Sequence, residues 1–135
     1  MSLKVFCDGG ARGNPGPAAA AFVVEKDGKV IFKSAKYLGK TTNNVAEYEA
    51  VVLAMRWLSK NNNFNEPIYF FLDSELVAKQ LGDLFKIKNE NLRNLYHTVK
   101  EEEKKISVKI FYSPVPRTKN KLADLLVNKV LDENP

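Results

Sequence analysis

The chain has 135 residues, of which 44% are hydrophobic and 27% are charged, and its formal net charge is +5. This composition is typical of a globular protein with a core of its own and argues against a disordered or fibrous chain. The longest uncharged apolar stretch, residues 18–24, is far shorter than the about 20 residues that span a bilayer, so no transmembrane helix is expected.

The positive net charge favours a polyanionic partner, although many basic proteins never bind nucleic acid. Cys7 is the single cysteine, which excludes an internal disulfide and a cysteine zinc site. We expect one domain over residues 1–135, with no targeting segment and no membrane contact. A monomer in the reducing cytoplasm agrees best with these features.

The predicted elements follow the order βββαβααβα. A strand at about 2–8 and a hairpin over 18–38, with its turn at Asp27-Gly28, predict a three-stranded antiparallel meander. The remaining predictions are a helix at 43–60, a buried strand at 68–73, helices at 74–81 and 90–105, a strand at 107–113 and a helix at 119–132. This order predicts an α/β layered domain whose later strands run parallel to the first.

Two aspartates, Asp8 and Asp73, each end an apolar predicted strand. In open α/β sheets, ligand sites lie outside the strand ends. Ordinary structural roles explain the same residues, because Asp8 is suited to start a turn and Asp73 to cap the following helix. Taken singly, the two interpretations are equally good.

Glu47 is more informative because it lies on the apolar face of its helix. The residues three, four, seven and eleven positions later are Ala50, Val51, Ala54 and Leu58. A carboxylate that faces a core costs several kcal/mol unless it is paired, protonated or bound to metal. The position of Glu47 therefore indicates a function.

Asp124 and Asn120 lie four residues apart at the border of the last helix's apolar side, which is formed by Leu122, Ala123, Leu126, Val127 and Val130. Asp124 alone is compatible with an ordinary surface position. Its importance rests on the set, because the predicted topology can bring Asp8, Glu47, Asp73 and Asp124 to one point.

Clustered carboxylates repel one another and raise one another's pKa, and a divalent cation relieves this repulsion. An oxygen-only donor set without histidine or cysteine favours Mg²⁺ (or Mn²⁺) over zinc or copper. Two such ions close together are suited to an in-line displacement at phosphorus.

Four segments together resemble the four motifs of type 1 ribonuclease H, in the same order: DGGARGNPGPAA at 8–19, TTNNVAEYEAVVLA at 41–54, FFLDSELV at 70–77 and NKLAD at 120–124. The resemblance spans nearly the whole chain. It implies a ribonuclease H-like fold, with a five-stranded mixed sheet flanked by helices. It also implies metal-dependent cleavage of the RNA strand of an RNA–DNA hybrid, which leaves 3′-hydroxyl and 5′-phosphate ends.

The resemblance also assigns roles to individual residues. The metal ligands fall on Asp8, Glu47, Asp73 and Asp124, and two ions are expected with substrate bound. Expected substrate contacts are Asn14 and Thr42 at a phosphate of the DNA strand, Asn43 and Asn44 in the minor groove, and Gly9, Gly10 and Asn120 nearby. The glycines at 9, 10, 13 and 16 would let the backbone approach a bulky polyanion without side-chain obstruction.

The chain departs from the family pattern at two places. Many members carry a histidine in the loop before the last helix, and here that loop reads SPVPRTKNK. The single histidine, His97, is expected at the surface of its helix. We expect Arg117 to contact the scissile or departing phosphate in place of the histidine, although a guanidinium cannot act as a general base.

The second departure is a basic protrusion that some bacterial members insert between the middle helices, for which this chain has too few residues. Lys40, Lys86 and Lys88 are candidates for the lost phosphate contacts, and a solvated role explains them equally well. The functional alternatives are action on double-stranded RNA, which also presents 2′-hydroxyls in a wide minor groove, and a noncatalytic duplex-binding module.

Overall fold

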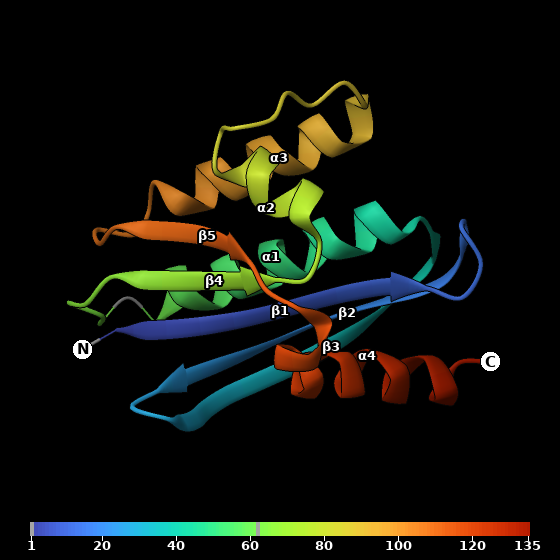
Figure 1. Cartoon of the computed structure of the whole chain (residues 1–135), viewed down its shortest axis with the longest axis horizontal. Coiled ribbons are helices and arrows are strands. Elements are labelled where there is room, and N and C mark those ends of the chain that lie inside the picture. The colour runs from blue at the N-terminus through green and yellow to red at the C-terminus, as the bar shows by residue number, and fades with distance from the viewer. Residues whose placement is uncertain (1, 62) are drawn as a thin grey trace.

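The structure is a computed structural model that describes residues 2–61 and 63–135. A five-stranded sheet in the order β3-β2-β1-β4-β5 forms its centre (Figure 1). The strands are β1 (Leu3–Ala11), β2 (Gly16–Lys26), β3 (Lys29–Thr41), β4 (Ile68–Leu72) and β5 (Ile110–Pro114). The helices are α1 (Asn43–Lys60), α2 (Glu75–Leu81), α3 (Glu90–Glu103) and α4 (Lys121–Glu133), with a 3-10 turn at Arg117–Lys119.

The sheet is mixed, as the sequence predicts. The strands β1, β2 and β3 form an antiparallel meander, and β4 and β5 run parallel to β1. The turn between β2 and β3 lies at Asp27 and Gly28, whose φ angles of 53° and 77° are those of a two-residue hairpin turn.

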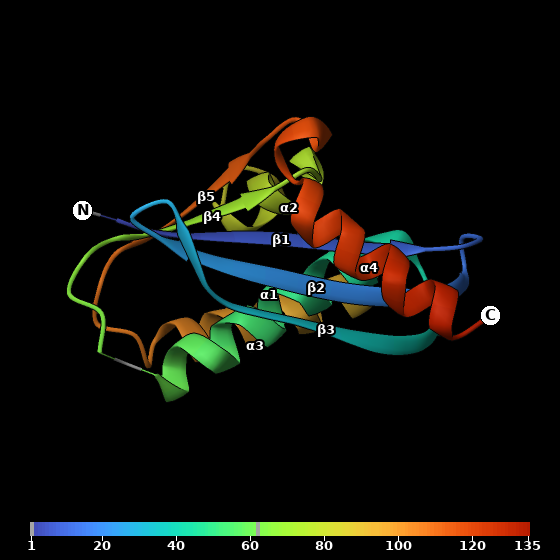
Figure 2. The ribbon, with the colours of Figure 1, turned by 90° about the horizontal axis from the view of Figure 1, so that it is seen from below.

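Helices cover both faces of the sheet and form two separate cores. Figure 2 shows α1 and α3 on one side and α4 on the other. Alternate residues of β1, namely Leu3, Val5 and Cys7, pack under α1 in the larger core. Ala19 and Ala21 of β2 pack against α4 in the smaller core. Because side chains alternate along a strand, Cys7 faces α1 and Asp8 faces α4.

The boundaries of α1 follow from its end residues. The Thr42 hydroxyl accepts a hydrogen bond from the Val45 amide at 3.2 Å and so caps the first turn. At the other end, the backbone amide and the side-chain amide of Asn61 both donate to the Trp57 carbonyl, at 3.0 and 2.8 Å. Between these caps the helix spans residues 43–60, as predicted.

Several other predicted boundaries are wrong, among them those of the hairpin predicted over 18–38, which runs from Gly16 to Thr41. The first strand does not end at Asp8 but continues to Ala11, because Gly9, Gly10 and Ala11 pair with β2. The fifth strand begins at Ile110 instead of residue 107, and the last helix begins at Lys121 after the 3-10 turn. Asp8 nevertheless lies just beyond the parallel ladder of β1 with β4, which ends at Cys7 and Leu72.

None of the helices in the described part of the chain combines the length and apolar character that a membrane span requires.

Candidate active site

Three carboxylates from three different elements meet at one end of the parallel strands. Asp8 lies on β1, Glu47 on α1, and Asp73 directly after β4. One oxygen of each lies within 4.8 Å of the others. Asp8 and Glu47 are only 5% and 6% exposed. The structure thus brings together three of the four carboxylates that the sequence singles out.

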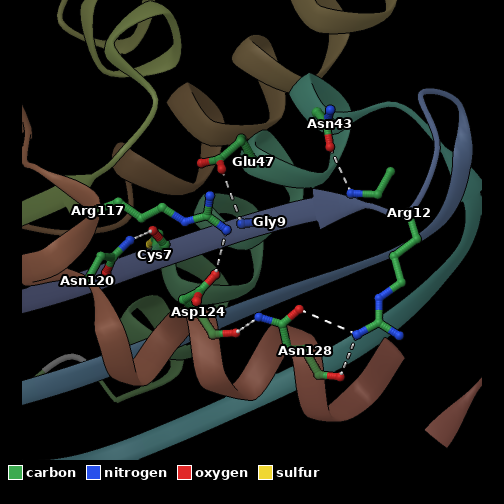
Figure 3. A network of polar contacts seen from close by, with 10 residues as sticks. Cys7, Gly9, Arg12, Asn43, Glu47, Arg117, Asn120, Asp124 and Asn128 are labelled. Carbon is green, nitrogen blue, oxygen red and sulfur yellow. Dashed lines mark hydrogen bonds and ion pairs between the residues drawn. The ribbon is translucent and has the colours of Figure 1, made fainter. Parts of the chain in front are cut away.

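Gly9 allows α1 to come this close to β1. A Cβ atom at Gly9 would lie 2.2 Å from the backbone carbonyl atoms of Ala46, a distance that no side chain tolerates. The Gly9 amide donates to Oε1 of Glu47 at 3.4 Å (Figure 3). Gly9 is therefore required by the packing of the chain itself, independently of any room that it leaves for a polyanion.

The helix-capping explanation of Asp73 does not hold. The cap of α2 is Ser74, whose hydroxyl accepts from the Val77 amide at 3.2 Å. Asp73 is therefore not needed to begin the helix, and its carboxylate belongs to the acidic cluster.

Asp124 approaches the cluster from the opposite side of the sheet. In Figure 3 Glu47 comes from α1 and Asp124 from α4, on the two sides of β1. Oδ1 of Asp124 accepts from Nη2 of Arg117 at 3.4 Å, and the Arg117 side chain is 76% exposed. Both residues line a cavity of about 540 Å³ together with Asp8, Glu47 and Asp73. Asp124 is therefore in the site, although it is outside the closest group of three.

The cluster is unfavourable for several negative charges at once. Burial, followed by the charges of Asp73 and Asp124, raises the pKa of Asp8 from 3.8 to about 8. Burial and the neighbouring charges of Asp8 and Asp73 raise the pKa of Glu47 well above its usual value. Within residues 2–61 and 63–135, Oε2 of Glu47 is buried without a hydrogen-bond partner. Buried oxygen donors with one unpaired oxygen fit a hard divalent cation such as Mg²⁺.

The sequence led us to expect Asn120 among the substrate contacts, but in the structure Asn120 is not on the surface. It is 1% exposed, and its Nδ2 donates to the carbonyl of Cys7 at 2.7 Å (Figure 3). The backbone carbonyl of Asn120 accepts a hydrogen bond from the Asp124 amide at 3.1 Å. Asn120 therefore joins the start of α4 to β1 and fixes where Asp124 lies relative to Asp8.

The four other polar residues that the resemblance assigns to substrate lie together. Asn14, Thr42, Asn43 and Asn44 line a second hollow, of about 380 Å³. Oδ1 of Asn14 accepts from the Asn43 amide at 3.0 Å, and Oδ1 of Asn43 accepts from the Ala11 amide at 2.8 Å. These bonds fasten the glycine-rich loop to the start of α1.

The lysines and the histidine lie elsewhere. Lys40 is exposed on β3, and it lines neither of these two hollows. Lys86 lines another hollow between α2 and α3, and Lys88 is exposed. His97 is exposed on α3, as predicted. Gly10 lines the acidic cavity.

Four further residues that line the two hollows were not predicted as site residues. Arg12 and Asn128 line the acidic cavity, where Nη2 of Arg12 lies 3.5 Å from Oδ1 of Asn128 and 2.7 Å from Oδ1 of Asp132. Asn89 and Asn91 line the second hollow. Asn89 precedes a predicted helix and caps it, which is a signal that the sequence carries. The partners of Arg12 lie more than a hundred residues away and have no comparable signal.

The known proteins that are similar to this chain include ribonucleases H. A ribonuclease HI of Halobacterium salinarum is 35% identical over 133 residues, which are 97% of this chain and 65% of that protein. A bifunctional protein of Mycobacterium tuberculosis is 34% identical over 98% of this chain and 36% of its own length. The crystal structure of LC11-RNase H1 in complex with an RNA/DNA hybrid is 34% identical, with a TM-score of 0.92 and 97% of each chain covered.

The family model described as reverse transcriptase-like matches residues 6–130. This chain spans about a third of the mycobacterial relative and about two thirds of the halobacterial one.

Proposed function

Because this chain belongs to the reverse transcriptase-like family and shares the fold of type 1 ribonuclease H, we propose that it is an endoribonuclease. It cleaves the RNA strand of RNA–DNA hybrids by hydrolysis and leaves 3′-hydroxyl and 5′-phosphate ends. The observation that carries this proposal is the convergence of Asp8, Glu47 and Asp73, which come from distant parts of the sequence, in a cavity that Asp124 also lines.

Asp8, Glu47, Asp73 and Asp124 would hold the divalent cations, two of them when substrate is present. When bound, Mg²⁺ or Mn²⁺ supplies polarisation of an attacking water and stabilisation of the leaving oxygen. The unpaired Oε2 of Glu47 supports this assignment, because a buried carboxylate oxygen without a partner is otherwise costly.

The substrate is recognised by its shape, phosphates and 2′-hydroxyls and not by base sequence. Asn14 and Thr42 contact a phosphate of the DNA strand, while Asn43 and Asn44 lie in the minor groove. The hollow that these four residues line supports the assignment, as does the RNA/DNA hybrid bound to LC11-RNase H1. Gly9 and Gly10 add backbone near the scissile strand. Lys40, which is exposed and precedes Thr41 of that hollow, contacts a phosphate.

Cleavage of labelled duplexes tests the proposal. RNA–DNA, RNA–RNA and DNA–DNA duplexes are incubated with the protein in Mg²⁺, in Mn²⁺ and in EDTA. We expect cleavage of the RNA strand of the hybrid with metal only, and a loss of at least about 100-fold in Asp8→Asn, which retains hybrid binding. The matched control is Asp27→Asn at the exposed hairpin turn, where asparagine tolerates the positive φ.

The same assay separates the alternatives. Comparable cleavage of the RNA–RNA duplex extends the substrate to double-stranded RNA. Hybrid binding by the wild-type protein without cleavage in either metal contradicts the enzyme and supports a noncatalytic module.

Arg117 contacts the scissile or departing phosphate. Its exposed side chain at the cavity beside Asp124 supports this role. We expect Arg117→Ala to lower turnover by about 10- to 100-fold, the effect of losing a hydrogen bond to a charged group. The melting temperature should not change, because an exposed ion pair contributes little. Arg56→Ala, on the exposed side of α1, is the control, and unchanged turnover in Arg117→Ala would contradict the role.

We further propose that the protein acts as a monomer in the cytoplasm. The single, buried cysteine supports a reducing compartment. Size-exclusion chromatography with light scattering measures the oligomeric state.

A further inference from the structure

Four aromatic side chains share the part of the sheet's α4 face that no helix covers. They are Phe6 of β1, Tyr69 and Phe71 of β4, and Phe111 of β5, and we refer to them as the aromatic face. The strand register pairs Phe6 with Phe71 and Tyr69 with Phe111, so all four side chains point to the same side. In Figure 1 no helix lies in front of β4, β5 or the first half of β1.

The rings of the aromatic face form two stacked pairs. The ring centroids of Tyr69 and Phe111 are 5.1 Å apart, and those of Phe6 and Phe71 are 5.2 Å apart. Phe111 is 43% exposed, and the other three are partly exposed. A contiguous group of partly exposed aromatic residues on a globular protein marks a binding surface.

The aromatic face adjoins the acidic cavity. Phe6 lies two residues before Asp8 on β1, and Phe71 lies two residues before Asp73. At a rise of about 3.3 Å per residue, the pair formed by Phe6 and Phe71 is about 7 Å from the carboxylates along the strands. A bound polymer that extends from the acidic cavity towards the start of β1 and β4 therefore contacts Phe6 and Phe71 first.

The surroundings of the aromatic face are basic. Lys4, Lys109, Lys119 and Lys121 are exposed, and none of them forms an ion pair within the described residues. Lys119 and Lys121 line a hollow of about 190 Å³ with Phe6, where Glu25 is the acidic residue. Lys4 and Lys109 lie at the start of β1 and just before β5.

We propose that the aromatic face binds a single-stranded segment of nucleic acid that continues from the duplex held in the acidic cavity. Exposed aromatic rings stack unpaired bases without regard to sequence, and the surrounding lysines attract the phosphates. The combination favours a polyanion with bases over an apolar peptide or a second copy of the chain. This site goes beyond the proposed cleavage, because it selects hybrids that end in, or are flanked by, a single strand.

Fluorescence anisotropy tests the proposal in the Asp8→Asn protein with Mg²⁺, so that no cleavage intervenes. The probes are a blunt RNA–DNA hybrid and the same hybrid with an oligothymidine tail on each of its four strand ends in turn. We expect a tail at one end to tighten binding by about tenfold. Tyr69→Ala and Phe111→Ala should each remove most of this gain and leave the affinity for the blunt hybrid unchanged.

The test has one control variant and one substitute variant. Tyr37→Ala removes a 39% exposed tyrosine of β3 outside the aromatic face and should keep the gain. If Tyr69→Ala fails to fold, Lys119→Gln with Lys121→Gln serves instead, and it should reduce the salt dependence of the tail's contribution. Equal affinity for blunt and tailed hybrids, or an equal gain in wild-type and Phe111→Ala backgrounds, overturns the proposal. So does a concentration-dependent dimer that Phe111→Ala abolishes.

The test of the aromatic face and the test of the proposed nuclease activity can fail independently. Cleavage of the blunt hybrid by the wild-type protein tests the nuclease alone. If the blunt hybrid is not cleaved but the tail effect and its loss in Phe111→Ala are observed, the nuclease proposal fails and this inference stands.

Discussion

Asp8 illustrates how single residues of the site depend on their neighbours. Its carboxylate is buried on β1, and it lines one cavity with Glu47 of α1 and Asp124 of α4. Gly9 makes the approach of α1 possible, and Asn120 secures that of α4 by its bond to the Cys7 carbonyl. The geometry of the carboxylates therefore rests on one glycine and one amide that do not have to touch the substrate.

Substitution of Asn120 separates positioning from substrate contact. Asn120→Ala removes the 2.7 Å hydrogen bond to the carbonyl of the buried Cys7, and we expect a loss of about 1–3 kcal/mol in the free energy of unfolding. Turnover of the hybrid should fall because Asp124 shifts, while KM stays the same. Asn94→Ala, on the exposed side of α3, should change neither value. A higher KM with an unchanged melting temperature would indicate a direct substrate contact instead.

The acidic residues of the site were predictable from the sequence, but the residues that hold the surrounding elements in position were not. Glu47 stands out because four apolar residues follow it at helical spacing. In contrast, the role of Asn120 depends on a carbonyl 113 residues away, and that of Arg12 on partners in α4. Contacts between residues so far apart leave no periodic pattern in a single sequence.

At the scale of elements, the contact between β1 and α1 determines the site. β1 carries Asp8 and α1 carries Glu47, and the two elements meet where Gly9 faces the backbone of Ala46. The apolar residues of α1 behind Glu47, from Ala50 to Leu58, hold the helix against the sheet in the larger core. Any atom inserted between β1 and α1 at this point therefore separates two of the carboxylates.

Gly9→Ala should separate β1 from α1. The new methyl group overlaps backbone that cannot rotate away, so we expect a loss of about 1–3 kcal/mol or more in stability and a large loss of turnover. Gly10→Ala is the matched control for stability, because its Cβ would meet only Cγ1 of Val127, at 4.0 Å. Chemical denaturation measures both variants, and equal stability would contradict the packing role of Gly9.

The elements were predicted most accurately where local chemistry defines their ends. Thr42 and Asn61 cap α1, and Asp27-Gly28 forms the turn between β2 and β3. The end of β1 was predicted wrongly, because a glycine-rich segment normally indicates a loop. Here Gly9 and Gly10 continue the strand since β2 supplies a pairing partner, which is a tertiary effect that overrides local preference.

For the whole molecule, the acidic cluster makes stability depend on pH and metal. The folded state raises the pKa of Asp8 from 3.8 to about 8, so between these values the folded chain retains a proton that the unfolded chain has lost. The free energy of unfolding therefore falls as the pH rises through this window. A cation that replaces the proton should restore the lost stability by linkage.

Thermal unfolding in EDTA and in Mg²⁺ checks this dependence. Without metal, we expect the melting temperature to fall by several degrees between pH 5 and pH 8. Millimolar Mg²⁺ or Mn²⁺ should raise it more at pH 8 than at pH 5. Asp8→Asn should flatten both effects, whereas Asp27→Asn should retain them. A metal-free melting temperature that rises over this range would contradict the buried cluster.

Cys7 has a further consequence for how the molecule opens. Its sulfur is fully buried between β1 and α1, and burial, followed by the charges of Glu47 and Asp8, raises the pKa of the thiol. A thiol-reactive label or an oxidant can reach this atom only while α1 is transiently detached from the sheet. The rate at which Cys7 is labelled therefore measures how often β1, which carries Asp8, and α1, which carries Glu47, separate.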